Sequence, residues 1–114
     1  VAAVNRYDHT KNTAFLCNPD GRWSLAPAYD LTHSYKISSE WVARHQMTIN
    51  AKAENVTRAD LEAIGDRFGI PAYKAIIAEV TGTVSRWTDF AAKAGVSEPA
   101  AEAIGADMAR FAPT

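Results

Sequence analysis

The sequence contains one cysteine, Cys17, among its 114 residues. A lone thiol cannot form an intramolecular disulfide, which argues against a disulfide-stabilised secreted scaffold and favours a reducing compartment. In its predicted strand, Cys17 is expected to be a small buried hydrophobe. The chain also lacks an apolar run near the ~20 residues of a membrane-spanning helix, and it shows no charged and apolar leader. We therefore expect a soluble, cytoplasmic protein that makes no membrane contact.

An excess of positive charge is missing too. The formal net charge is −1 and the sequence pI is about 6.3, and lysines and arginines form no cluster. Modules that bind nucleic acid are usually basic, so direct binding to DNA or RNA is not expected. The cysteine and the histidines, His9, His33 and His45, do not stand at the short set intervals of a zinc site, which argues against a zinc centre.

A turn sequence near the start of the chain predicts a β-hairpin. The turn is Asn-Pro-Asp-Gly at positions 18–21, and it separates two short apolar stretches, residues 13–17 and 22–25. Proline sets φ at the second position of such a turn, and glycine accepts a positive φ. The side chains of Trp23 and Tyr29 are expected to lie in the core of this hairpin.

The hairpin would bring Asn12 close to Asp30, although eighteen positions separate them. Phosphoryl transfer uses a loop carboxamide and a carboxylate to hold magnesium on the nucleotide phosphates. Mg²⁺ suits such a pair, because it takes few protein ligands and completes its shell with water and phosphate oxygens. Taken singly, Asn12 would be a turn residue that bonds its own backbone, and Asp30 a capping or loop carboxylate.

Three longer motifs carry a family resemblance. They are Asp-His-Thr-Lys-Asn at positions 8–12, Leu-Ala-Pro-Ala-Tyr-Asp at 25–30 and Arg-His-Gln-Met-Thr-Ile-Asn at 44–50. With these motifs the chain resembles the C-terminal lobe of HipA-type serine/threonine kinases. The resemblance implies the toxin half of a bacterial toxin–antitoxin pair, with a kinase-like fold and with ATP and Mg²⁺ as cosubstrates. It also implies that Asn12 and Asp30 are the metal ligands and that Lys11 is a phosphate-facing base beside them.

The chain departs from the family pattern at the proton acceptor. The family carries a catalytic aspartate five residues before the asparagine, and that position is Tyr7 here, with Asp8 one residue later. A tyrosine, with an unperturbed pKa of about 10, is a poor proton acceptor at neutral pH. Asp8 has three candidate roles: a surrogate base reached through a changed loop path, a cap, or an ion-pair partner of Arg6 or Lys11. We expect the base to be absent, and we expect His9 to anchor the loop by hydrogen bonds.

A kinase also needs a Gly-rich loop over the nucleotide and a strand lysine paired with a helix glutamate. The sequence shows neither, so we expect a single domain, residues 1–114, that corresponds to the C-lobe and lacks the N-lobe. Within a complete protein this lobe would help transfer phosphate from ATP to a Ser or Thr hydroxyl, and alone it would be inactive. The alternative is a degenerate, non-catalytic remnant that binds a partner, either a cognate antitoxin or a separate N-lobe polypeptide.

Three other segments in the first half have their own patterns. Residues 1–4 predict part of a helix that leaves an apolar surface open, with self-association as the consequence. Residues 31–44 are polar, are interrupted by single large apolar residues, and predict a long irregular loop. Residues 47–50 predict a short strand.

The second half predicts helices. Thr57, with an acid at the third helical position, starts a helix that Gly69 ends. Residues 71–95 predict a long helix, kinked near Gly82, whose core-facing stripe consists of Tyr73, Ile76, Ile77, Val80, Val84, Trp87 and Ala91. Residues 97–113 predict the last helix, with a serine cap and a proline stop. The expected fold is mainly α (α+β), a protein-kinase-like C-terminal lobe with a small β-hairpin near the N-terminus.

Overall fold

The computed structural model describes residues 1–114. In chain order its elements are the 3₁₀ helix η1 (Thr10–Asn12), the strands β1 (Phe15–Cys17) and β2 (Trp23–Leu25), and the helices α1 (Arg58–Arg67), α2 (Tyr73–Val84), α3 (Trp87–Lys93) and α4 (Glu98–Arg110). The fold is therefore mainly helical with one small antiparallel sheet near its start, as the sequence predicts. None of the helices combines the length and the apolar character needed to cross a membrane.

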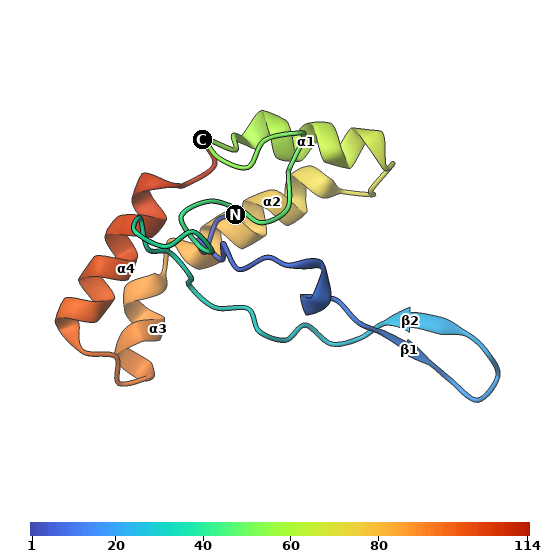
Figure 1. Ribbon diagram of the computed structural model, residues 1–114, viewed down its shortest axis with the longest axis horizontal. Helices are drawn as coiled ribbons and strands as arrows, with labels where there is room; N and C mark the ends of the chain where they lie inside the picture. The colour runs from blue at the N-terminus through green and yellow to red at the C-terminus, as the bar shows by residue number, and fades with distance from the viewer.

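The β-hairpin extends away from the helices, and two pairs of helices form the rest of the fold (Figure 1). Helix α1 packs against α2, and α3 packs against α4. Between the hairpin and α1 the chain runs back through a long stretch without regular structure, which confirms the irregular loop expected at residues 31–44.

The predicted turn closes the hairpin. Phe15 pairs with Leu25, and Cys17 pairs with Trp23. At the turn, the Gly21 N–H donates to the carbonyl of Asn18 at 3.0 Å, and Gly21 has a φ of 76°. Glycine is needed here because a side chain disfavours a positive φ.

The hairpin has no buried core, which corrects three of the sequence predictions. Cys17 is exposed, Trp23 is 71% exposed and Tyr29 is 44% exposed. The physical reason is that a sheet buries a face only when a second layer covers it, and no other element makes an extensive contact with β1 or β2. Trp23 and Cys17 instead stand on one open face with Phe15 and Leu25, because paired residues in the antiparallel register point to the same side.

The predicted cap at the start of α1 is present, and Thr57 and Asp60 form two reciprocal hydrogen bonds there. The Thr57 hydroxyl accepts from the Asp60 N–H, and the Asp60 carboxylate accepts from the Thr57 N–H at 2.8 Å. The same buried carboxylate accepts from the Lys52 ammonium at 2.8 Å and from the Asn50 amide at 2.9 Å. These donors, with Lys52 first, hold the pKa of Asp60 well below its usual value of 3.8. Asp60 therefore joins the start of α1 to the preceding turn.

We expect Asp60→Asn to lower the Tm by about 5 °C or more, because an amide cannot accept from all of these donors or pair with Lys52. Since the folded pKa is depressed, this stability is present above pH 3.8 and is lost as the pH falls toward the folded pKa. Thermal unfolding followed by circular dichroism measures both effects. Glu62→Gln is the matched control on α1, since its ion pair with Arg58 is partly exposed and contributes little. An Asp60→Asn Tm equal to that of the control would contradict this role.

Two predicted elements in the first half are wrong. Residues 1–4 form a turn closed by the Val4 N–H and the Val1 carbonyl at 2.9 Å, and not a helix. Val4 has a φ of 53°, which is incompatible with a right-handed helix, and its side chain is fully buried. Residues 47–50 form only an isolated bridge between Ile49 and Lys52, because no neighbouring strand is present to pair with them.

The long helix predicted over residues 71–95 is two helices. It begins at Tyr73, because Ala72 has a φ of 54°, and it breaks between Val84 and Trp87. The break lies three residues beyond Gly82, at Ser85, whose hydroxyl donates to the Gly82 carbonyl at 2.8 Å. Beyond it, the Trp87 indole N–H donates to the Ala101 carbonyl of α4 at 2.8 Å. Packing of α3 on α4 therefore redirects the chain although the apolar stripe continues.

Helices α1 and α2 meet where Tyr73 covers Gly65. A Cβ atom at Gly65 would lie 2.3 Å from the Tyr73 ring, so this contact requires glycine. The Tyr73 hydroxyl donates to the Asp66 carboxylate at 2.6 Å, and this bond raises the pKa of Tyr73 to about 12. At the other end of the helical half, Ser97 occupies the predicted cap position of α4, but its side chain makes no capping hydrogen bond.

Much apolar surface remains uncovered. The accessible surface is 8140 Å², whereas a compact monomer of 12.4 kDa exposes about 6,100 Å². On the predicted core stripe, Ile76 and Val80 are each about half exposed, at 48% and 49%. The buried hydrophobic residues are Val4, Val56 and Ala91. The chain thus presents open apolar faces on both the hairpin and the helices.

Candidate functional site

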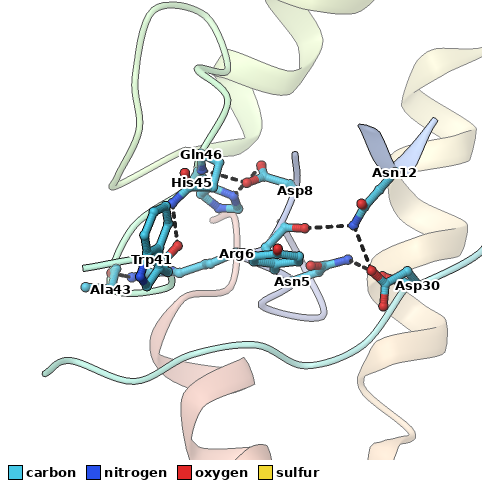
Figure 2. A network of polar contacts seen from close by, with 10 residues as sticks. Asn5, Arg6, Asp8, Asn12, Asp30, Trp41, Ala43, His45 and Gln46 are labelled. Carbon is cyan, nitrogen blue, oxygen red and sulfur yellow. Dashed lines mark hydrogen bonds and ion pairs between the residues drawn. The ribbon is translucent and has the colours of Figure 1, made fainter. Parts of the chain in front are cut away.

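The structure brings Asn12 and Asp30 into direct contact. The Asn12 side-chain N–H₂ group donates to the Asp30 carboxylate at 3.1 Å, as Figure 2 shows. It also donates to the Tyr7 carbonyl at 3.0 Å. Asn12 ends η1, and Asp30 follows β2 along the chain, so the hairpin joins the two residues as its turn sequence predicts. A carboxamide and a carboxylate therefore converge across the base of the hairpin.

The backbone at Asp30 has an unusual conformation. Its φ is 54°, in the left-handed region, which aspartate adopts more readily than most residues but still at a cost. Its carbonyl accepts from the Asn5 side-chain amide at 3.4 Å, as Figure 2 also shows. Backbone conformations of this kind are concentrated at functional sites. The contacts with Asn5 and Asn12 hold Asp30 in this position on an exposed part of the chain.

The remaining oxygen atoms of the pair have the chemistry of a magnesium site. Both donors of the Asn12 amide are used, whereas Asn12 Oδ1 and Asp30 Oδ1 make no hydrogen bond within the protein. Amide and carboxylate oxygens are the ligand types that Mg²⁺ takes, with water and phosphate oxygens completing its shell. The residues present thus fit a hard divalent cation with few protein ligands.

Lys11 lies beside this pair on η1. Its carbonyl accepts from the Tyr29 hydroxyl at 2.7 Å, and its N–H donates to His9 Nδ1 at 3.1 Å. The Lys11 side chain is exposed and forms no ion pair. His9 therefore caps η1, in agreement with the anchoring role expected of it, and Tyr29 fixes the backbone next to Asn12.

Tyr7 lies five residues before Asn12, and its carbonyl accepts a hydrogen bond from the Asn12 side-chain amide. Asp8, the next residue, faces another part of the protein (Figure 2). One of its carboxylate oxygens bonds His45 Nδ1 at 2.8 Å, and the other accepts from the Gln46 N–H at 2.7 Å. Of the roles considered for Asp8, the structure shows pairing with a basic side chain, and the partner is the His45 imidazole, through a hydrogen bond, in place of Arg6 or Lys11.

His45 is buried against Asp8, which the sequence pattern did not indicate. Burial lowers the pKa of the His45 imidazole below its usual value of 6.5, and the bond with Asp8 opposes that shift. The adjacent Gln46 side chain donates to the Trp41 carbonyl. The segment around residue 45 is thereby fastened to the loop that carries Tyr7 and Asn12.

A pH effect on folding follows from His45. Because its folded pKa is depressed, the unfolded chain takes up the proton at a higher pH than the folded chain does. The stability is fully present above about pH 6.5 and falls as the pH drops below that value. We expect His45→Gln to remove this decrease in Tm between pH 7 and pH 5, measured by thermal unfolding. The decrease in Tm at lower pH that depends on Asp60 should remain. If the Tm of His45→Gln depended on pH in the same way as that of the unsubstituted protein, His45 would not be the group responsible.

Arg6 is a further residue of this region that the sequence analysis did not place. It is 5% exposed, with its guanidinium carbon 4.7 Å from the Tyr35 ring centroid and 4.0 Å from that of Phe111. Its side chain also donates to the Ala43 carbonyl, and its N–H donates to the Ser34 carbonyl at 3.2 Å. Arg6 thus joins the loop before Asn12 to residues 34–43 and to the end of α4. No local motif marks this role, because its partners are distant in sequence.

A second histidine ties the irregular segment to the helices. His33 Nε2 lies 3.0 Å from the Asp107 carboxylate of α4. His33 and His45, which carry no metal-ligand spacing in the sequence, therefore each pair with an aspartate. These pairs position the loop that follows Asp30.

Comparison with known proteins agrees with the sequence motifs. No curated protein and no solved structure matches the chain. A family model described as the HipA-like C-terminal domain matches residues 1–113. Since this match spans almost all of the chain, the protein belongs to the family of HipA-like C-terminal domains.

Proposed function

We propose that this domain forms the metal- and phosphate-binding part of a HipA-like serine/threonine kinase site, with Asn12 and Asp30 as the magnesium ligands. The contact between the two side chains at 3.1 Å is the observation that carries the proposal. Family membership supports a component of a toxin–antitoxin system, with the cytoplasm as its compartment. Lys11, on the same short helix as Asn12, supplies a positive charge for the phosphates of ATP.

The chemistry of this site is positioning and charge neutralisation. Bound Mg²⁺ would supply the positive charge that neutralises the phosphate oxygens during transfer to a Ser or Thr hydroxyl. Asp30 contributes the negative charge that attracts the ion, and its contact with Asn12 keeps both side chains at one place. The bond from Asn12 to the Tyr7 carbonyl fixes the amide plane, so that Asn12 Oδ1 remains the oxygen left for the metal.

Proton acceptance is the weak part of the site. Tyr7 stands at the position of the family's aspartate, and both Asp8 oxygens are engaged by His45 and Gln46. Removing Asp8 from these partners would leave His45 without its hydrogen bond inside the protein. We infer that Asp8 is a structural residue and that the domain binds Mg²⁺ and nucleotide more readily than it transfers phosphate.

A second candidate function is a non-catalytic partner-binding module. The open apolar face of the hairpin, where Trp23 is 71% and Phe15 is 60% exposed, favours it. Large exposed apolar surface is typical of protein interaction sites. An antitoxin or a separate nucleotide-covering lobe would cover this face, and in their absence the domain would self-associate.

Paramagnetic NMR distinguishes the two functions. We expect Mn²⁺ with ATP to broaden the amide signals of Asn12 and Asp30 selectively, while signals of α4 stay sharp, because Mn²⁺ prefers the same oxygen ligands as Mg²⁺. Added Mg²⁺ should reverse the broadening by competition. If Mn²⁺ and ATP leave the Asn12 and Asp30 signals unchanged, the nucleotide site is refuted and the partner-binding module is the better description.

A further inference from the structure

A small cavity lies behind the loop that carries Asn12, on the side of Asp8 and His45. Its volume is about 230 Å³, room for several water molecules at about 30 Å³ each. The ionisable groups of its lining residues are the side chains of Arg6, His45 and Arg110, the Val1 amino group and the Thr114 carboxylate, and no aspartate or glutamate side chain is among them. The two guanidinium groups outnumber the one carboxylate, so the lining is positive in a protein whose net charge is −1.

Arg6 brings an unsatisfied donor to this cavity. The residue is 5% exposed, and its Nε atom is buried without any hydrogen-bond partner. Stacking on the rings of Tyr35 and Phe111 stabilises the guanidinium through its faces, but it provides no acceptor for the in-plane N–H. A buried donor without a partner is costly and rare in folded proteins. An acceptor that reached Arg6 from the cavity, which Arg6 lines, would remove that cost.

Arg110 and His45 lie around the same space. The Arg110 guanidinium carbon is 5.1 Å from the Phe111 ring centroid, so Arg6 and Arg110 rest on one ring. Neither arginine forms an ion pair with any carboxylate of the chain. His45, also buried, uses Nδ1 for Asp8 and has no protein partner for Nε2. Two guanidinium groups and one imidazole thus border one cavity, and neither guanidinium has an ion-pair partner.

We propose that this cavity binds a phosphate-sized oxyanion, either free phosphate or a phosphate monoester, through the guanidinium groups of Arg6 and Arg110, with His45 at its border. Guanidinium groups are the side chains best matched to phosphate, because their planar N–H groups donate in pairs to its oxygens. The site is separate from Asn12 and Asp30, and it does not depend on the proposed kinase function. Because Arg6 and His45 also anchor the loop on both sides of Tyr7, the bound anion stabilises that loop.

Titration with inorganic phosphate at constant ionic strength tests this site. We expect saturable shifts of the His45 imidazole signals in NMR spectra and a rise of the Tm with phosphate concentration. Arg110→Gln should weaken the phosphate affinity at least about tenfold, because it removes a charged donor. Arg86→Gln is the matched control, since Arg86 is also exposed and also lies over a phenylalanine ring, that of Phe90 at 5.5 Å, outside the cavity.

Arg110 is the residue to replace first, because it is exposed and its loss should not unfold the protein. Arg6→Lys, with folding checked by circular dichroism, keeps the charge but removes the paired donors, and it should also weaken binding. Phosphoserine distinguishes the sources: binding as tight as that of phosphate identifies a monoester site, and weaker binding identifies a site for the free anion. Phosphate shifts that are not saturable, or equal affinities in Arg110→Gln and Arg86→Gln, would overturn the proposal.

Discussion

Replacing Tyr7 by aspartate should increase ATP-dependent phosphoryl transfer by about 100-fold or more once the domain is joined to a nucleotide-covering lobe of a HipA-type kinase. A positioned proton acceptor contributes roughly 10²- to 10⁴-fold to such reactions. The Tyr7 carbonyl accepts a hydrogen bond from the Asn12 amide, so the backbone of Tyr7 lies beside the proposed metal-binding pair. Release of ADP measures the gain.

Tyr7→Asn is the control for this gain of activity. Asparagine has nearly the shape of aspartate but cannot accept the proton, so we expect no increase over the unsubstituted protein. Asp8→Asn in the Tyr7→Asp background should mainly lower the Tm, because it weakens the bonds to His45 and Gln46. Equal rates for Tyr7→Asp and Tyr7→Asn would show that proton acceptance does not limit the reaction. High activity in the joined protein before any substitution would show that Tyr7 is no obstacle.

The second large effect is expected at Asp30. Asp30→Asn should weaken Mg²⁺ or Mn²⁺ binding at least about 100-fold in the presence of ATP, because the substitution removes the one carboxylate of the proposed ligand pair. The amide can still accept the hydrogen bond from Asn12, which is 3.1 Å long in the structure, so the fold should be retained. Calorimetry with Mg²⁺ and ATP measures the affinity.

Asp20→Asn is the matched control for Asp30→Asn. Asp20 lies in the hairpin turn, is exposed, and makes no ion pair, so its substitution changes the net charge equally. Its metal affinity should stay within about twofold of that of the unsubstituted domain, the change that distant, screened charges produce. If both variants lost affinity equally, the effect would be one of overall charge, and Asp30 would not be a ligand.

The elements that the sequence predicted well depend on neighbours within a few positions. The turn at residues 18–21 closes the hairpin, and Thr57 caps α1 with Asp60. Such features are encoded by residue types at fixed short spacings. The approach of Asn12 to Asp30 belongs with them, because a tight hairpin must return the chain to its starting point.

Apart from the helix predicted at residues 1–4 and the strand predicted at 47–50, the predictions that were wrong concern burial and continuity. Periodicity predicts an apolar stripe but does not show whether another layer covers it, and Ile76 and Val80 remain half exposed. The stripe also continued through Ser85, where the helix breaks because Trp87 bonds the backbone of α4. On the hairpin, Trp23 is a large apolar residue of the kind usually found in a core, but it stays exposed because no second layer covers the sheet.

Residue types and their short-range spacing were sufficient for the hairpin, the cap of α1 and the candidate pair Asn12 and Asp30, because local backbone geometry determines these features. The contacts of Asp8 with His45 and of Arg6 with Phe111 came from the folded chain alone. They join positions 37 and 105 residues apart, and no local pattern specifies which distant partner a charged side chain meets. For that reason the folded structure, and not the motif, showed that the carboxylate of Asp8 is already engaged.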